Sequence, residues 1–160
     1  MQIMISKMSE GYDLKWNKFH VNASETFNNL RLEESFTDIT LVSDDHCMIK
    51  AHKLVLIASS QYFHNLLKVI PASSPFICLE GVSSPDLKFL VEYIYNGEIK
   101  VPKDFIKRFL QLAKRFLIKG LCKENETQNI KKKTLESEDF YVLIKNKIDK
   151  ANEIFNLTNQ

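Results

Sequence analysis

The chain has 160 residues, of which 44% are apolar and 11% aromatic, and its formal net charge is +2 at pH 7. That size fits one globular domain with its own core, and so small a charge does not favour nucleic acid or an anionic membrane as the default partner. No apolar run is long enough to span a membrane, and the first eight residues lack the pattern of a secretory signal. The widely spaced Cys47, Cys78 and Cys122 are typical of reduced thiols in an intracellular protein.

Hydropathy divides the chain into four segments. Residues 1–11 are expected to be a flexible N-terminus, and the dense apolar blocks of 12–122 are expected to fold as one domain. Residues 123–138 have few apolar side chains and are predicted to be a polar linker. Apolar residues recur at i, i+4 and i+8 in 139–157, which predicts an amphipathic helix. Its role stays open between docking on its own domain, dimerising, and belonging to the next element of a longer chain.

The first half of the domain alternates helical and strand patterns. Asn22, with Glu25 three residues later, has the pattern of an N-cap before helically spaced apolar residues. Two short strand-like runs, 38–42 and 47–50, flank a Ser-Asp-Asp sequence and predict a β-hairpin. Two helices are expected to follow, the second capped by Ser60.

The second half contains shorter strands and longer helices. A strand is predicted over Phe76–Leu79, and Ser84 followed by proline is the expected start of a helix that ends at the left-handed stop of Gly97. Another short strand is predicted over Glu98–Val101, and a last helix with a wide apolar stripe is predicted to end at Gly120. Helices outnumber strands, so the fold class is α+β with a helical majority.

Five stretches carry motifs that occur together in one domain family. In Ala51–Phe63, an Ala-His-Lys sequence enters a helix, and a serine and an aromatic pair open the next helix. The other stretches are 36–42, 87–97, 112–121 and Tyr12–Lys18. Together they resemble the BTB/POZ domain, and Tyr12–Lys18 is similar to the Phe-x-Leu-Arg-Trp-Asn-Asn opening of its tramtrack-type subgroup, which occurs mainly in insect nuclear factors. The resemblance implies the BTB/POZ fold, with a small short-stranded sheet and an N-terminal strand exchanged with a second chain.

No motif for catalysis or metal binding accompanies these stretches. The chain has no Gly-x-Ser-x-Gly sequence, phosphate-binding loop or closely spaced Cys or His pair. His46 and Cys47 are neighbours in or beside a strand and therefore point to opposite faces. His52 is interpreted as a satisfied core or cap histidine rather than a ligand. We therefore expect no enzymatic activity, no cofactor and no metal site.

An apolar surface near the N-terminus is the candidate dimer interface. It consists of Leu14, Trp16 and Phe19, together with Phe27 and Leu30 of the first helix. Aromatic anchors such as tryptophan are enriched in interfaces, and the alternation of Leu14 and Trp16 fits a strand edge. The alternative is that the first twenty residues fold back on their own subunit. We favour exchange with a second chain and two-fold pairing.

Asp38 and Lys53 are the second candidate site. From the residues alone, they are a solvated Asp beside a strand and a solvated Lys at a helix start. The resemblance implies instead a charged pair in a pocket at the dimer interface, which helps to specify assembly or recruits a corepressor segment. A buried pair of this kind is sensitive to the loss of either partner.

The leading functional hypothesis is a protein-interaction module that homodimerises or multimerises and takes part in nuclear transcription regulation. Its partners would be further copies of itself and other BTB proteins, with no direct nucleic acid or membrane contact. One alternative is a substrate adaptor for a cullin-type ubiquitin ligase, although 68–74 lacks the apolar-x-Glu step of such adaptors. Another is a partner of longer BTB proteins that lacks DNA binding, since the chain has no zinc finger. The three lysines at 131–133 indicate either a nuclear import element or a solvated linker.

Overall fold

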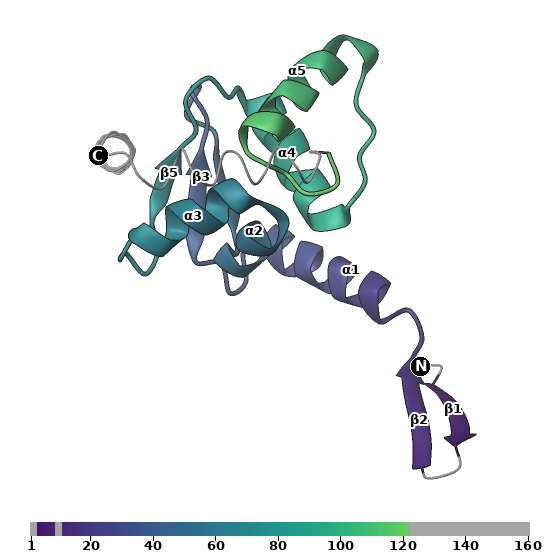
Figure 1. Ribbon diagram of the computed structural model, residues 1–160. Helices are drawn as coiled ribbons and strands as arrows, with labels where there is room; N and C mark the ends of the chain where they lie inside the picture. The colour runs from purple at the N-terminus through teal and green to yellow at the C-terminus, as the bar shows by residue number, and fades with distance from the viewer. Residues whose placement is uncertain (1–2, 9–10, 122–160) are drawn as a thin grey trace.

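The computed structural model describes residues 3–8 and 11–121 (Figure 1). The predicted linker at 123–138 and the predicted helix at 139–157 lie outside this range. The elements, in chain order, are β1 (Ile3–Met8), β2 (Gly11–Trp16), α1 (Phe19–Leu32), β3 (Ile39–Val42), β4 (Met48–Ala51), α2 (Lys53–Ser59), α3 (Gln61–Val69), β5 (Phe76–Cys78), α4 (Ser84–Asn96) and α5 (Lys103–Arg115). The predicted α+β class with a helical majority is confirmed.

Two separate sheets organise the described residues. β1 and β2 form an antiparallel two-stranded hairpin, and the other sheet has the order β4-β3-β5. In that sheet β3 pairs antiparallel with β4 and parallel with β5. All four residues of β3 are buried, because helices and neighbouring strands enclose this central strand.

The main core lies between the three-stranded sheet and helices α2 to α5 (Figure 1). Its largest fully buried side chains include Phe63, Phe116, Leu41 and Leu56. Phe63 and Phe116 stack with their ring centroids 6.0 Å apart. The core therefore joins α3 to the end of α5 and fixes the body from which the N-terminal elements project.

Local capping signals were predicted correctly at two helix ends. The Ser60 side chain accepts a hydrogen bond from the Phe63 N–H at 3.1 Å and caps α3. Gly97 ends α4 with a φ of 74°, the left-handed conformation that glycine adopts without a Cβ penalty. The N-cap of α4 is Ser83, one residue before the predicted Ser84.

The start of α1 differs from the prediction. The helix begins at Phe19 after Lys18, whose φ of 63° is left-handed, and Asn22 lies inside the first turn instead of capping it. The Asn22 N–H donates to the Lys18 carbonyl at 2.9 Å. Only Asn17 and Lys18 separate β2 from α1, so the sharp turn between them decides the start. A side-chain cap contributes only about 1 kcal/mol and is easily overridden.

Three further segments differ from their predictions. The N-terminus, expected to be flexible over 1–11, contains strand β1, because it pairs with β2 along its whole length. Residues 98–101, predicted to be a strand, have no strand partner within the described part of the chain. Helix α5 ends at Arg115 rather than near Gly120. There the chain turns so that the Phe116 carbonyl accepts from the Ser60 hydroxyl at 2.6 Å.

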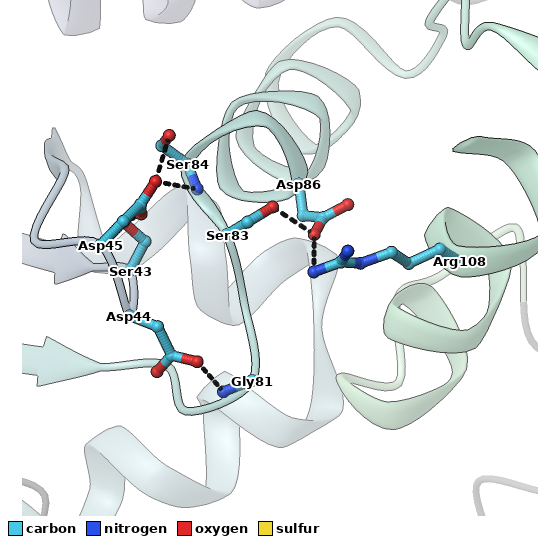
Figure 2. Close-up of polar contacts among 8 residues, drawn as sticks. All are labelled: Ser43, Asp44, Asp45, Gly81, Ser83, Ser84, Asp86 and Arg108. Atoms are coloured by element: carbon cyan, nitrogen blue, oxygen red, sulfur yellow. Dashed lines mark hydrogen bonds and ion pairs between the residues drawn. The ribbon is translucent and has the colours of Figure 1, made fainter. Parts of the chain in front are cut away.

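A group of carboxylates joins the β3–β4 turn to the start of α4 (Figure 2). Asp45 accepts from the hydroxyl of Ser84 at 2.6 Å and from its N–H at 3.2 Å. Asp44 accepts from the Gly81 N–H at 2.8 Å. Hydrogen bonds from Ser43 and Ser84 lower the pKa of Asp45 to about 2. These acceptors satisfy N–H groups at and before the helix start, so the turn fixes the position of α4.

Asp86 extends this group into the interior. Only 1% of its surface is exposed, and its carboxylate accepts from the Ser83 hydroxyl at 2.6 Å and contacts the Arg108 guanidinium at 2.6 Å. Arg108 is half-exposed and belongs to α5. Asp86 therefore links the first turn of α4 to α5, and water reaches only one side of the ion pair.

We expect Asp86→Ala to lower the free energy of unfolding by about 2 kcal/mol, since hydrogen bonds to charged groups contribute about 1.5–3 kcal/mol. Asp104, an exposed acid in the first turn of α5, is the matched control, and its replacement by alanine should cost less than about 1 kcal/mol. Urea denaturation followed by circular dichroism measures both. Equal losses in the two variants would contradict the role given to Asp86.

Candidate protein-interaction surface

The arm, defined here as β1, β2 and α1, extends away from the body of the domain (Figure 1). Every residue of β2 is exposed and no residue of α1 is buried. The body, by contrast, encloses a continuous core. The alternative in which the first twenty residues fold back on their own subunit does not match this arrangement.

Strand β2 has an apolar face. Leu14 lies opposite Ile5 and Tyr12 lies opposite Lys7 in the hairpin register. Because side chains alternate along a strand, Tyr12, Leu14 and Trp16 share one face. Leu14 is 69% exposed and Trp16 is 48% exposed. The hairpin thus presents large apolar side chains that its own chain leaves uncovered.

The apolar surface continues across the joint between β2 and α1. The rings of Trp16 and Phe19 meet edge to face with centroids 5.1 Å apart. On α1, Phe27 is exposed and Leu30 is half-buried. The five residues predicted for a dimer interface therefore all lie on the arm. Sequence reasoning missed Val21 and Leu32, which are also exposed on α1 and whose helical spacing gave no separate signal.

Polar contacts attach α1 to the body. The Ser24 hydroxyl donates to the Tyr95 carbonyl at 2.7 Å, and the Arg31 guanidinium lies 5.1 Å from the centre of the Tyr95 ring. The Asn28 side chain accepts two hydrogen bonds from Arg31 and orients it. Tyr95 in α4 thus determines where the base of the arm meets the domain.

Tyr95 is held in place by His52. The Tyr95 hydroxyl lies 2.8 Å from both the main-chain N–H and the ring Nδ1 of His52. The other ring nitrogen, Nε2, lies 2.9 Å from the Ser35 carbonyl. A carbonyl only accepts, so Nε2 carries the hydrogen and Nδ1 accepts from the Tyr95 hydroxyl. Burial raises the pKa of Tyr95 to about 12. The prediction of a satisfied core or cap histidine is confirmed.

Asp38 and Lys53 are brought together, but not as an ion pair. Asp38 Oδ1 accepts from the main-chain N–H of Lys53 at 2.7 Å. The Lys53 ammonium instead donates to the carbonyls of Ala72 and Ser73, at 2.9 and 2.6 Å. Lys53 is the first residue of α2, and the N-cap His52 makes no side-chain cap. Asp38 therefore acts as a capping acceptor supplied by another segment, and the predicted direct contact of the two charges is absent from this chain.

A shallow hollow of about 360 Å³ lies beside the end of α4. It is lined by Glu92 and Asn96 of α4 and by Glu98, Ile99 and Lys100. Within the described residues, no main-chain hydrogen bond joins the N–H groups of 98–101 to another segment. This stretch is therefore an unpaired main-chain edge next to a hollow.

Neither a metal-binding cluster nor a membrane-spanning helix occurs among the described residues. No group of three or more His, Cys, Asp or Glu among them could hold a metal ion. Over the same ranges, none of the helices has both the length and the apolar character needed to cross a bilayer.

Comparison with known proteins gives consistent results. Residues 27–133 match the family model described as the BTB/POZ domain. Among curated proteins of Drosophila melanogaster, the chain is 40% identical to Protein bric-a-brac 1 over 117 residues and 38% identical to the tramtrack alpha isoform over 119 residues. Those matches cover 73% and 74% of this chain but only 12% and 14% of the two relatives.

A shorter relative and a solved structure match over most of their lengths. Longitudinals lacking protein-like, also from Drosophila melanogaster, is 43% identical over 109 residues, which cover 68% of this chain and 85% of that protein. The BTB domain of zebrafish PATZ1 superposes with a TM-score of 0.63 at 20% identity, and the match covers 77% of this chain and 99% of that one. At that identity the superposition supports the fold alone.

We expect Tyr95→Phe to destabilise the domain by about 1–3 kcal/mol, because the change keeps the ring but leaves the buried His52 N–H and Nδ1 without a partner. Tyr12→Phe is the matched control, since Tyr12 is exposed on β2, and it should change stability by less than about 0.5 kcal/mol. Chemical denaturation of both variants measures the difference. If they behave alike, the Tyr95 hydroxyl has no structural role.

For Asp38, the geometry predicts that an acceptor atom matters more than charge. Asp38→Ala should cost about 1 kcal/mol, the usual loss for a helix cap, whereas Asp38→Asn keeps an Oδ1 acceptor and should cost less. Lys53→Met should not couple to Asp38→Asn in a double-mutant cycle. A loss in Asp38→Asn as large as in Asp38→Ala, relieved by Lys53→Met, would restore the charged-pair interpretation.

Proposed function

The chain belongs to the BTB/POZ domain family, a family of non-enzymatic interaction modules, and we propose that it homodimerises or multimerises through its arm as part of nuclear transcription regulation. BTB domains multimerise and associate with other BTB proteins. Partners of the same kind are therefore proposed for this chain. We also propose that it has no catalytic activity of its own and requires no cofactor.

The observation that carries this proposal is the exposed apolar face of the arm. Soluble monomers rarely expose contiguous apolar patches of more than a few hundred Å², yet here Tyr12, Leu14, Trp16 and Phe19 are all exposed on consecutive elements. Burying such side chains stabilises an assembly by about 1.5–3 kcal/mol each. Two-fold pairing, the commonest symmetry of homo-oligomers, would cover the face with its counterpart.

The proposed assembly includes strand exchange. The arm of one copy offers a strand edge, and the 98–101 segment of another offers main-chain groups that have no partner in the described chain. Joining the two supplies main-chain hydrogen bonds by β-strand addition, while side chains of the added strand fill neighbouring pockets. The hollow lined by Ile99 and Lys100 gives such side chains a place to pack.

The regulatory part of the proposal rests on the relatives. One of them is named transcription activator GAGA, and another is named zinc finger protein chinmo. By analogy, we propose that the chain acts in the nucleus, where it pairs with BTB proteins that carry DNA-reading elements. A corepressor segment is a further proposed partner. The cullin adaptor remains an alternative from the sequence, and no contact in the described residues favours it.

We expect Trp16→Ala to shift the protein to smaller assemblies, because truncating an interface hot spot costs about 2 kcal/mol or more. Lys15→Ala is the control, since Lys15 lies on the same strand with the opposite orientation and is also exposed. Light scattering at micromolar concentration measures the mass of each variant, and circular dichroism should show that Trp16→Ala keeps its helices.

Hydrogen exchange tests the exchanged strand separately. In the wild-type assembly, the amides of 98–101 should be protected, and Trp16→Ala should remove that protection while leaving the amides of β3 unchanged. A wild-type chain that scatters light as a single 18.6 kDa species would contradict assembly. If the chain assembles but its 98–101 amides are unprotected, pairing is retained and strand exchange is refuted.

A further inference from the structure

The three-stranded sheet has two faces, and the main core lies against only one of them. Leu41 of β3 and Ile77 of β5 belong to the main core together with helices α2 to α5. Because side chains alternate along a strand, the residues next to them point to the opposite side of the sheet. We call that side the outer face, and it consists of Thr40 and Val42 of β3 and their parallel partners Phe76 and Cys78 of β5.

The outer face is covered, although it lies outside the main core. Val42 has no exposed surface, and Cys78 is only 7% exposed. These two residues form a separate apolar cluster, and Phe76 packs against it. Among the described residues, no side chain from a helix belongs to this cluster. The burial of Val42 and Cys78 therefore requires a further covering segment.

The two edge strands show where this cover lies. β4 and β5 are both edge strands of the sheet, and Met48 and Lys50 of β4 pair with the outer-face residues of β3. Met48 and Lys50 are exposed, whereas Cys78 is buried and Phe76 is half-buried on β5. An open face would expose the side chains of both edges alike. The cover therefore lies over β3 and β5 and leaves β4 open to solvent.

The covering segment belongs to the same chain. The structure contains a single chain, so the outer face is buried without a second copy. Apart from two pairs of residues in the arm, the part of the chain beyond the described ranges is 122–160. The arm extends away from the body (Figure 1). The candidates are therefore the two segments that follow Leu121.

Of these two segments, 139–157 has the composition that the outer face needs. Its apolar residues recur at 140, 144, 148, 151 and 155, and this spacing forms one stripe along a helix. We call these five positions the apolar stripe. In 123–138, by contrast, only Ile130 and Leu135 are apolar. A helix with one apolar side is the usual partner of an apolar sheet face.

The connection is long enough for this position. Residues 122–138 join Leu121 to the segment, and a stretch of that size reaches roughly 55 Å when extended. A body of about 100 residues has a radius of gyration of only about 13 Å. The segment can therefore reach either face of the sheet.

We propose that residues 139–157 form an amphipathic helix that docks on the outer face of the same chain, with the apolar stripe against Val42, Phe76 and Cys78. The sheet then lies between two helical layers, α2 to α5 on one side and the docked helix on the other. The docked helix makes β3 the central strand of a sheet that is buried on both faces. The docking does not involve the arm and is independent of assembly through it.

The accessibility of the Cys78 thiol in the full chain tests this docking. N-ethylmaleimide labelling mapped by mass spectrometry should find Cys78 protected in the wild-type chain, with the half-buried Cys47 of the β3–β4 turn as the internal reference. Ile148→Asp places a charge in the apolar stripe and should speed the labelling of Cys78 at least about tenfold. Asn146→Asp adds the same charge on the opposite side of the helix and should leave the rate unchanged. Equal Cys78 rates in the two variants overturn the proposal.

Hydrogen exchange reports the docked helix directly. Amides within 139–157 should be protected in the wild-type chain and should lose protection in Ile148→Asp, while the amides of β3 keep theirs. Unprotected 139–157 amides in the wild type would overturn the docking. If Ile148→Asp also exposes β3, the milder pair Ile148→Ala and Asn146→Ala decides the comparison.

Dilution identifies the occupant of the outer face. Docking within one chain predicts that the protection of Cys78 persists when the protein is diluted from micromolar to low nanomolar concentration. Protection that disappears on dilution would assign the outer face to a second copy and would overturn the proposal.

Discussion

The hydrogen-bonded pair of Tyr95 and His52 connects the parts of the molecule that matter for interaction. Through its hydroxyl, Tyr95 contacts both the main chain and the ring of His52, the N-cap residue of α2. Through its carbonyl and the face of its ring, it holds Ser24 and Arg31 of α1. The His52 ring in turn donates a hydrogen bond to the Ser35 carbonyl, in the loop that follows α1. Each polar group in this network has a partner. These polar contacts, rather than buried apolar side chains, therefore hold the base of the arm against the body.

These polar contacts explain how α1, which has no buried residue, keeps its position against the body. Polar contacts are directional, so they set the angle at which α1 leaves the body, while contributing only about 1 kcal/mol each to stability. The apolar side chains of α1 and β2 are then left for another surface. A domain that used Phe27 or Trp16 in its own core would gain stability, but it would lose the exposed apolar surface proposed here for recognising a second chain.

The features that the sequence predicted well depend on neighbouring residues. Ser60 caps α3 and Gly97 ends α4 because each acts on main-chain groups a few positions away. The misplaced end of α5 depends on a distant partner instead, whereas the misplaced start of α1 depends on a local turn. Helix α5 stops early because the chain after it pairs with Ser60, more than fifty residues away, and Asn22 lost its capping position to the short joint after β2. The five apolar residues proposed for the interface could be listed from the sequence because an aromatic stretch precedes and enters the first helix, whereas the exposure of each one depends on the structure. The main-chain N–H that donates to Asp38 could not be predicted, because a sequence pattern does not distinguish a side-chain partner from a main-chain one.

The cap that Asp38 gives to α2 also constrains the order in which the domain folds. Helix α2 has seven residues, well below the roughly 12–15 at which isolated helices become even marginally stable. Its first N–H is satisfied by a carboxylate fifteen positions earlier, next to a strand whose own position depends on pairing with β4. The helix therefore gains its cap only after the β3–β4 hairpin has closed. Hairpin closure therefore favours helix formation, and the cap of α2 is expected to form no earlier than the β3–β4 hairpin in the folding transition state.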